Sequence, residues 1–454
     1  MAKRPHDGDR LEIPVTVEQE DVVLHRDLGD AAIDRTANRL SGAPEVEVDP
    51  SPCCGRGRRP GRASRSASGY DRADVGSRRR RPASDVRRMR LLWLIDSLNV
   101  GGAESLVVPF ATRAPGITVA FLSAAGENLV EQELRRRGVR TVCLGARDLR
   151  DRAAFRRLVD LVREEKFDLV HAHLAYSAIW SALLSRRTGI PSVVSLHASP
   201  AATKSLAPGL VHAVKVEIKD RLMRFVVNRW SRRVIMVSAA LGDLYAGSFD
   251  PAKVRVVHNG IEVDRFRRDR AETRARLERE YGIPPGVKLA VAVSVLRPGK
   301  GIEVLLDAVE RITGTHFLIV GDGPKRAEWQ AMTTSDRVHW AGYRTDVDAI
   351  LAGCDLFVHP SLDDAFPTVL LEAMAAGLPV VASNVGGIPE IVDVLPPVRT
   401  GILVPPGDPG ALANAIRDVA PSMGLAARER AEREFSIEAW MARLERVYAE
   451  AVRT

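Results

Sequence analysis

Short apolar runs alternate with helical patterns from Met89 almost to the end of the chain, and this alternation limits the folds open to it. The apolar runs have the length and Val content of buried parallel strands. Strands that alternate with helices imply a parallel sheet with helices on its faces. The pattern runs once to about residue 265 and starts afresh near residue 287. We therefore expect an α/β protein with two doubly wound, Rossmann-like domains.

The chain is long enough for this arrangement, since 454 residues with 45% hydrophobic content suffice for two cores. We expect ligands in a cleft between the two sheets. The expected order is a disordered extension at 1–88, a first Rossmann-like domain at 89–265, a linker at 266–286, a second Rossmann-like domain at 287–436, and a helix at 437–454 that packs back on the first domain.

The first 88 residues contain little that could form a core, and their charge is uneven. Residues 1–50 hold 6 Lys and Arg against 12 Asp and Glu, whereas residues 51–88 hold 12 Arg against 3 Asp. Such composition is typical of disordered segments. An arginine-rich arm for nucleic acid or anionic lipid is one interpretation, but Tyr70 is its only aromatic residue. We favour a dispensable extension and expect no nucleic acid partner.

Cysteine spacing and hydropathy favour a cytoplasmic protein. Cys53 and Cys54 are adjacent, Cys143 and Cys354 are isolated, and none has the spacing of a disulfide framework or a zinc site. No apolar run approaches the ~20 residues that span a bilayer. Residues 204–233 combine apolar positions with Lys and Arg at helical spacing, which fits an interfacial helix on the inner membrane face. An ordinary amphipathic core helix with a basic outer face is the interpretation we favour.

The stretch from Pro360 to Ser383 is the most informative in the chain, because it combines a strand end, a loop, a helix and a second strand. We expect its helix to open on Pro367 and to end at Gly377. Glu372 lies deep in this otherwise apolar helix and therefore needs a polar partner. Asp364 lies in the loop after the strand, where open α/β sheets bind ligands.

The amide groups around Phe366 to Val369 lie between these two carboxylates, at the expected start of the helix. A helix N-terminus attracts phosphate through its dipole and its unpaired N–H groups. Carboxylates accept hydrogen bonds from hydroxyl groups, so the implied ligand carries both hydroxyls and phosphate. A sugar nucleotide fits that description.

Two glycine loops of the second half are further candidates. Arg297 and Lys300, in RPGKG, follow a strand and could neutralise a diphosphate, which we favour over a solvated basic loop. The turn GDGP, with Gly323, fits a nucleobase border and a simple turn equally well. Asp346 and Asp348 form a DxD pattern, but helix N-terminal acids explain them better than a metal does.

In the first half, Gly101 and Gly102 follow the first strand and allow close approach of a ligand, although a tight turn alone is nearly as good an explanation. His197 ends a later strand and is expected to face the ligand. His171 and His173 form an HxH pattern without a third ligand at suitable spacing. We expect no metal and no cofactor.

Taken together, these segments resemble the retaining GT-B glycosyltransferases of family 4. The resemblance spans Met89 to about Val447 and rests on VGGAE, DLVHAHL, VVSLHAS, VRVVHNGIEVDRF, LRPGKGIEVLLDA, FLIVGDGP, FSIEAW, and above all PSLDDAFPTVLLEAMAAGLPVVAS with VGGIPEIV. It implies metal-independent transfer of a sugar, with retention, from a nucleotide donor to a hydroxyl of a glycan, a lipid-linked or a small-molecule acceptor. Polysaccharide biosynthesis is the expected context.

The resemblance also assigns roles by position. Glu372 would hold the ribose hydroxyls and Asp364 those of the transferring sugar, while Lys300 with Arg297 would stabilise the leaving diphosphate. His197 would contact the sugar near its reacting carbon. The remaining donor contacts fall on Gly101, Gly102, Gly323, Ala365, Phe366, Pro367 and Thr368.

Two departures from the family pattern affect the site. The family commonly has Glu-Gly where this chain has Asp364 and Ala365, so the sugar chosen could differ. It also often has arginine at the position of Val295, which makes the phosphate role of Arg297 less secure than that of Lys300. A nucleotide-sugar epimerase of GT-B fold and a non-catalytic sugar-nucleotide-binding protein are the alternatives. Turnover of the donor alone would identify an epimerase, and donor binding without turnover would identify a non-catalytic binding protein.

Overall fold

A computed structural model describes residues 89–99, 101–198, 210–394 and 399–453. The extension at 1–88 and residues 204–209 of the basic segment therefore lie outside the described residues. The described chain forms two parallel sheets, of seven and six strands. The prediction of two Rossmann-like α/β domains is confirmed. The domain boundaries themselves remain a prediction.

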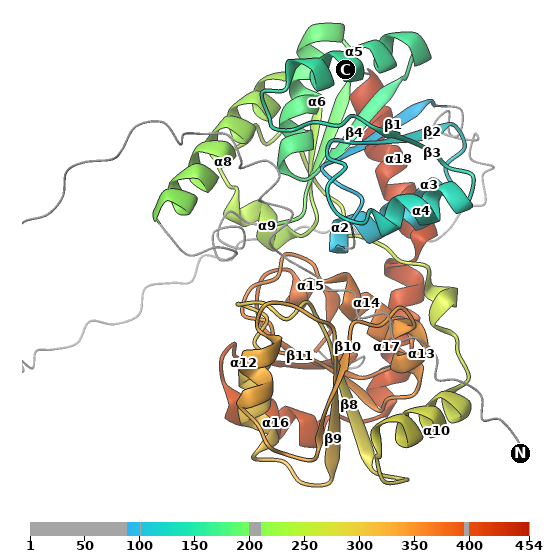
Figure 1. The fold of residues 1–454 in the computed structure, drawn as a ribbon, viewed down its shortest axis with the longest axis vertical. Coiled ribbons are helices and arrows are strands. Elements are labelled where there is room, and N and C mark those ends of the chain that lie inside the picture. Colours follow the sequence, from blue (N-terminus) through green and yellow to red (C-terminus); the bar gives the residue numbers. More distant parts are fainter. Residues whose placement is uncertain (1–88, 100, 199–209, 395–398, 454) are drawn as a thin grey trace, which may run out of the picture. The chain divides into compact units, whose positions relative to one another are not determined.

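The first sheet has the strand order β3-β2-β1-β4-β5-β6-β7, with β1 beside both β2 and β4. The core is split between its faces. Helices α5 and α6 cover one face and α3 and α18 the other (Figure 1). The strands are β1 (Leu91–Ile95), β2 (Ile117–Phe121), β3 (Arg140–Cys143), β4 (Leu169–His173), β5 (Ser192–Leu196), β6 (Arg233–Met236) and β7 (Val254–Val256). The helices are α2 (Gly102–Ser105), α3 (Val107–Ala111), α4 (Leu129–Arg136), α5 (Arg152–Glu165), α6 (Ala175–Thr188), α8 (Leu210–Trp230), α9 (Ala239–Leu244) and the 3-10 turn η2 (Val263–Phe266).

The second sheet has the order β10-β9-β8-β11-β12-β13, so that β8 and β11 are neighbours. Helices α11 and α16 pack on one face, and α13, α14 and α17 on the other. The strands are β8 (Lys288–Val293), β9 (Thr315–Val320), β10 (Val338–Gly342), β11 (Leu356–His359), β12 (Val380–Ser383) and β13 (Gly401–Val404). The helices are α10 (Arg270–Tyr281), α11 (Ile302–Val309), α12 (Arg326–Ala331), α13 (Val347–Ala352), α14 (Thr368–Ala375), α15 (Ile388–Ile391), α16 (Pro409–Asp418), α17 (Ser422–Glu434) and α18 (Ile437–Arg453).

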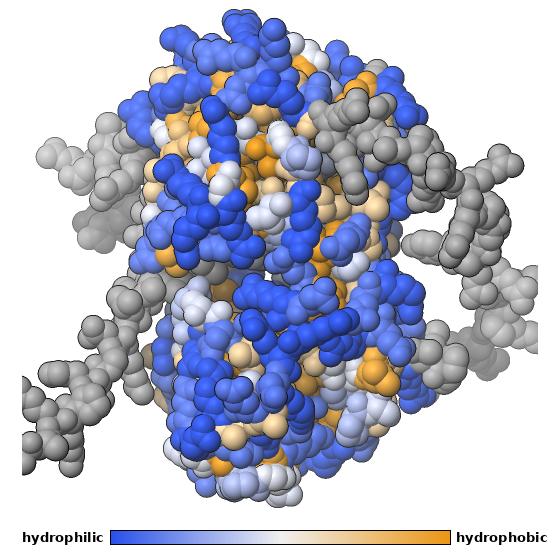
Figure 2. Space-filling model, turned by 90° about the vertical axis from the view of Figure 1, so that its right-hand side faces the viewer, coloured by the Kyte–Doolittle hydropathy of each residue, from blue (hydrophilic) through white to orange (hydrophobic). Residues whose placement is uncertain are grey.

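Two segments connect the sheets. The range 266–286 contains helix α10, whose Leu277 is fully buried and would clash with any side chain at Gly353. The last helix, α18, packs on the first sheet, where the ring of Trp440 meets Trp93 edge-on at 6.4 Å. On the face shown in Figure 2, hydrophilic residues predominate and hydrophobic residues show between them in smaller groups.

Helix α8 differs from the sequence expectation. Its inner positions Val216, Met223 and Val227 are buried, as expected for a core helix. Its outer face, however, is not simply basic, because Ile218 and Phe225 are 62% and 65% exposed. No helix among the described residues is long and apolar enough to cross a membrane.

Candidate active site

Lys300 and Asp364 meet at the carboxyl edge of the second sheet, where the loops after β8 and β11 lie together. Lys300 Nζ lies 2.7 Å from Asp364 Oδ2, across 64 positions of sequence. The two loops are pressed together, since a Cβ atom at Gly301, with φ of +66°, would lie 1.9 Å from the carbonyl oxygen of Pro360. Neighbouring parallel strands end at the same edge, which brings a cation and a carboxylate to one point.

Asp364 is held ionised by its neighbours. Burial alone would raise its pKa, but Lys300, together with hydrogen bonding to His359, brings the pKa well below the ordinary value. His359 Nε2 lies 3.2 Å from Asp364 Oδ2, and the Ser361 hydroxyl donates to the same oxygen at 3.4 Å. Lys300, His359 and Ser361 therefore all contact the same oxygen, Asp364 Oδ2. Lys300 and Asp364 form an ion pair that these contacts hold in place.

Helix α14 begins one residue later than expected, because Pro367 is its N-cap and Thr368 its first residue. No side chain caps this end, so its amides are directed to the surroundings. The ring of Phe366 is buried and stacks on His258 at 4.9 Å, so this residue offers a ligand only its backbone. The carbonyl of Ala365 lies so close to Gly387 that only glycine fits there.

Glu372 lies one turn further along α14 and is partly buried. Burial raises its pKa to about 7, against the favourable charge of Arg265, while Asp348 adds to the rise. The described residues provide no hydrogen bond to its carboxylate and no contact joining it to Lys300. The partner that its position requires is therefore not supplied by the described chain, and the carboxylate is poised for a ligand with hydroxyl donors.

The two glycine loops after β8 and β9 pack against each other and share hydrogen bonds. Gly323 has φ of +156°, and a Cβ atom there would lie 2.5 Å from the carbonyl oxygen of Leu296. The amide of Leu296 in turn donates to the carbonyl of Asp322 at 2.9 Å. Packing against this loop thus explains Gly323 without a ligand. Arg297 lies in the same loop and is partly buried, whereas Val295 is 44% exposed.

The first sheet presents a chain of neutral histidines at its carboxyl edge. His197 Nε2 lies 2.9 Å from His173 Nδ1, and His173 Nε2 lies 3.3 Å from His171 Nδ1. His171 also meets the hydroxyls of Ser195 and Tyr448, at 2.8 and 2.7 Å. Burial lowers the pKa of His197 to about 4 and that of His171 to about 3. These side chains are uncharged at neutral pH and form a polar network.

The two acids of the DxD pattern are engaged in salt bridges with arginines. Asp348 is buried and lies 2.9 Å from Arg268 Nε, while Asp346 lies 2.8 Å from Arg344 Nε. The described residues contain no group of three or more His, Cys, Asp or Glu side chains that could hold a metal ion. Asp346 and Asp348 are therefore explained by their ion pairs at the start of α13.

Gly101 and Gly102 have different environments. A Cβ atom at Gly101 would lie 2.2 Å from Glu104 Oε2, whereas one at Gly102 would meet nothing within 4 Å. The helix expected after them is divided at Leu106 into α2 and α3. A Cβ atom at Gly101 would therefore displace the buried Glu104 side chain. Gly102 is the one of the two that leaves room for a ligand.

Sequence reasoning did not identify two further carboxylates. Asp96 follows β1 and accepts hydrogen bonds from the amide of Ser177, at 2.6 Å, and from its hydroxyl. Burial raises the pKa of Asp96. Glu390 of α15 accepts from the amides of Ala239 and Ala240, at 2.8 and 2.9 Å, and lies 2.8 Å from His258 Nε2. Asp96 could have been expected, because it directly follows a strand and open α/β sheets bind ligands in such loops. No local pattern, however, indicates the partners of Glu390.

Comparison with known proteins identifies the family. The family model for glycosyl transferases group 1 matches residues 287–421, and that for Glycosyltransferase Family 4 matches residues 100–265. N-acetyl-alpha-D-glucosaminyl L-malate synthase of Bacillus anthracis is 30% identical over 321 residues, which cover 67% of this chain and 80% of that protein. D-inositol 3-phosphate glycosyltransferase of Mycobacterium tuberculosis is 31% identical over 274 residues, which cover 55% of this chain and 53% of the relative.

Solved structures agree on the fold. HepE from Anabaena, in complex with UDP and glucose, has a TM-score of 0.70 at 22% identity, over 80% of this chain and 99% of that one. Sucrose-phosphate synthase from Thermosynechococcus elongatus has a TM-score of 0.64 at 23% identity, over 80% and 98%. With both of its halves matched and the Bacillus relative covered over most of its length, the chain belongs to glycosyltransferase family 4 and has the GT-B fold.

Proposed function

We propose that this glycosyltransferase transfers a sugar from a nucleoside diphosphate sugar to an acceptor hydroxyl with retention and without a metal. The observation that carries the proposal is the contact of 2.7 Å between Lys300 and Asp364. Because HepE is solved in complex with UDP and with UDP-glucose, UDP sugars are the first donors to test. The acceptor is a glycan, a lipid-linked molecule or a small molecule.

The charge pair suggests how a donor is received. On donor binding, Lys300 moves from Asp364 to the diphosphate oxygens, and Asp364 accepts hydrogen bonds from hydroxyls of the sugar. The open amides at the start of α14 add positive potential at the same edge. Glu372 accepts hydrogen bonds from the ribose hydroxyls, which supply the donors that its carboxylate lacks.

The reaction then depends on stabilising the charge of the departing diphosphate, and in this proposal Lys300 supplies the cation. The C1–O bond to the phosphate breaks as the acceptor oxygen bonds to C1 on the same face. The leaving phosphate oxygen takes the acceptor proton, so no base from the protein is required. Asp364 binds the hydroxyls of the transferring sugar in this scheme and takes no proton from the acceptor.

The test is a panel of UDP sugars with candidate acceptors, in which released UDP is measured and the anomeric configuration of the product is read by NMR. We expect a product with the donor's configuration, formed equally well with and without EDTA. An inverted product would refute retention. Activity lost in EDTA and restored by Mg²⁺ or Mn²⁺ would refute metal independence, and isomerisation of donor alone would indicate an epimerase.

A further inference from the structure

Helix α8 carries an exposed apolar row on the face that does not pack against the protein. Among the described residues, 13 large hydrophobic side chains are exposed, and five of them follow one another along this helix at spacings of three and four. The exposed fractions range from 40% to 69%, for Val211, Val214, Ile218, Leu222 and Phe225. At about 1.5 Å per residue the row is roughly 21 Å long. A row of this length at helical spacing is a surface, not a scatter of single residues.

The charges on the same face are positive. The exposed polar positions that continue the row are Lys215, Arg221 and Arg229. Within 211–230 Asp220 is buried and lies 2.7 Å from Arg224, whereas Glu217 is partly exposed and pairs with Arg221 at 2.9 Å. Lys215 and Arg229 are therefore the exposed cations of this face that no acid of the helix pairs with in the described residues. A flexible cationic side chain beside an apolar row suits a surface that is apolar inside and anionic outside.

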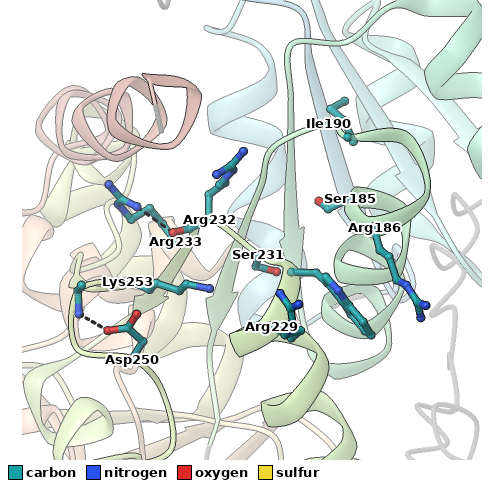
Figure 3. A pocket seen from close by; sticks show the side chains of 12 residues that line it. Ser185, Arg186, Ile190, Arg229, Ser231, Arg232, Arg233, Asp250 and Lys253 are labelled. Atoms are coloured by element: carbon teal, nitrogen blue, oxygen red, sulfur yellow. Dashed lines mark hydrogen bonds between the residues drawn. The ribbon is translucent and has the colours of Figure 1, made fainter.

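A basic pocket of about 520 Å³ lies at the C-terminal end of this helix. Its cations come from the ends of α6 and α8 and from the segments around β6 and β7, as Figure 3 shows, and they are Arg186, Arg229, Arg232, Arg233 and Lys253. Asp250 is the only acidic residue among the described residues that line it, and Arg233 is also paired with Glu450 at 3.0 Å. The excess of positive charge favours an anion with several oxygens, such as a phosphate ester.

The apolar row and the pocket form one continuous surface. Arg229 belongs to both, and the ring of Phe225 lies 6.2 Å from the ring of Trp230, which lines the pocket. The guanidinium of Arg186 lies over the ring of Trp230, 4.8 Å from its centroid. One partner surface could therefore contact the apolar row and place an anionic group at the adjoining pocket.

We propose that the outer face of α8 and the adjoining basic pocket dock on an anionic phospholipid bilayer, with the apolar row in the interface and a lipid phosphate at the pocket. A second copy of the chain fits less well, because pairing this face with itself would bring like charges together. The proposal goes beyond the transfer reaction, and it holds whichever donor is used.

The test is flotation of the full chain with vesicles of phosphatidylcholine alone or with 30% phosphatidylglycerol (roughly one anionic lipid in three). We expect binding to the anionic vesicles only, weakened by salt. The double variant Ile218→Asn/Phe225→Asn should bind at least about tenfold more weakly. Arg186→Gln and Arg229→Gln should each cost about fivefold.

The matched control is Met332→Asn/Leu425→Asn, which removes two other exposed apolar side chains, 48% and 66% exposed, from the second half of the chain. It should bind vesicles like the unaltered chain, and both double variants should melt and bind UDP normally. Binding that survives Ile218→Asn/Phe225→Asn would assign the vesicles to another segment, such as the arginine-rich residues 51–88, and would overturn the proposal. A dimer that this variant converts to a monomer, without vesicle binding by either, would also overturn it.

Discussion

The carboxyl edges of the two sheets differ in charge: the second sheet carries ionised side chains there, and the first carries neutral ones. At the second sheet, a lysine and a carboxylate are in direct contact, and Glu372 carries a pKa raised to about 7. At the first sheet, three histidines are linked in a neutral chain, with pKa values lowered by burial. The contrast fits the proposed reaction, in which the charged edge would bind the diphosphate of the donor and the neutral edge would face the acceptor hydroxyl.

The largest effect is expected for Lys300→Ala, which removes the cation from the charged edge. We predict a loss of about 10³-fold in kcat/KM, because an interaction with developing negative charge is lost. Steady-state assays of UDP release measure it. Lys325→Ala is the matched control, since Lys325 is a lysine of the neighbouring loop that pairs with the exposed Glu328, and it should leave activity intact. Equal losses in the two variants would contradict the assignment.

Asp364→Asn should distinguish the contribution of Asp364 from that of Lys300. We expect transfer to fall about 10²-fold, because the sugar hydroxyls lose a charged acceptor. The affinity for UDP without sugar should instead rise, since Lys300 no longer has a carboxylate 2.7 Å away. Isothermal titration with UDP gives the answer. Weaker UDP binding in this variant would mean that Asp364 contributes to the nucleotide site itself.

Glu372→Gln should have opposite effects on binding and on stability. The donor KM is expected to rise about 30-fold as the ribose hydroxyls lose a charged partner. The raised pKa means that below pH 4.5 both folded and unfolded forms are protonated, and between pH 4.5 and 7 only the folded form is. Stability of the unaltered chain therefore falls as pH rises through that window, by up to about 3 kcal/mol.

Glu372→Gln removes this loss, so the melting temperature of the variant at pH 8 should exceed that of the unaltered chain. The unaltered chain should also bind donor less well as pH falls below 7, because its Glu372 carboxylate then takes up a proton. A variant that is both less stable and inactive at pH 8 would show Glu372 to be structural.

The smallest effect concerns the edge of the first sheet. Gly102→Ala should leave the melting temperature unchanged, because the added Cβ atom meets nothing within 4 Å, and should raise the donor KM a few-fold, about what a local clash with ligand costs. Gly101→Ala is the contrasting variant and should lower the melting temperature, because the added Cβ atom forces the buried carboxylate of Glu104 to move. If Gly102→Ala leaves every kinetic constant unchanged, the ligand does not approach this turn.

The sequence was a good guide wherever a strand end determines position. The loops of Lys300 and Asp364 could be expected at one edge, but their contact depends on β8 and β11 being neighbours, which no local pattern states. The inward ring of Phe366 and the contacts of Glu390 depend on partners more than 100 positions away. Only the outer face of helix α8 was misjudged, and for another reason: apolar residues lie on both faces, so the sequence lacks the periodicity that distinguishes an inner face from an outer one.

The most direct test of the proposed donor site is a crystal structure with an intact, non-hydrolysable UDP sugar. We predict that Lys300 Nζ lies within about 3 Å of a diphosphate oxygen, that Asp364 accepts a hydrogen bond from a sugar hydroxyl, and that Glu372 meets the ribose. A donor bound elsewhere, with the contact between Lys300 and Asp364 still at 2.7 Å and Glu372 away from the nucleotide, would contradict that site.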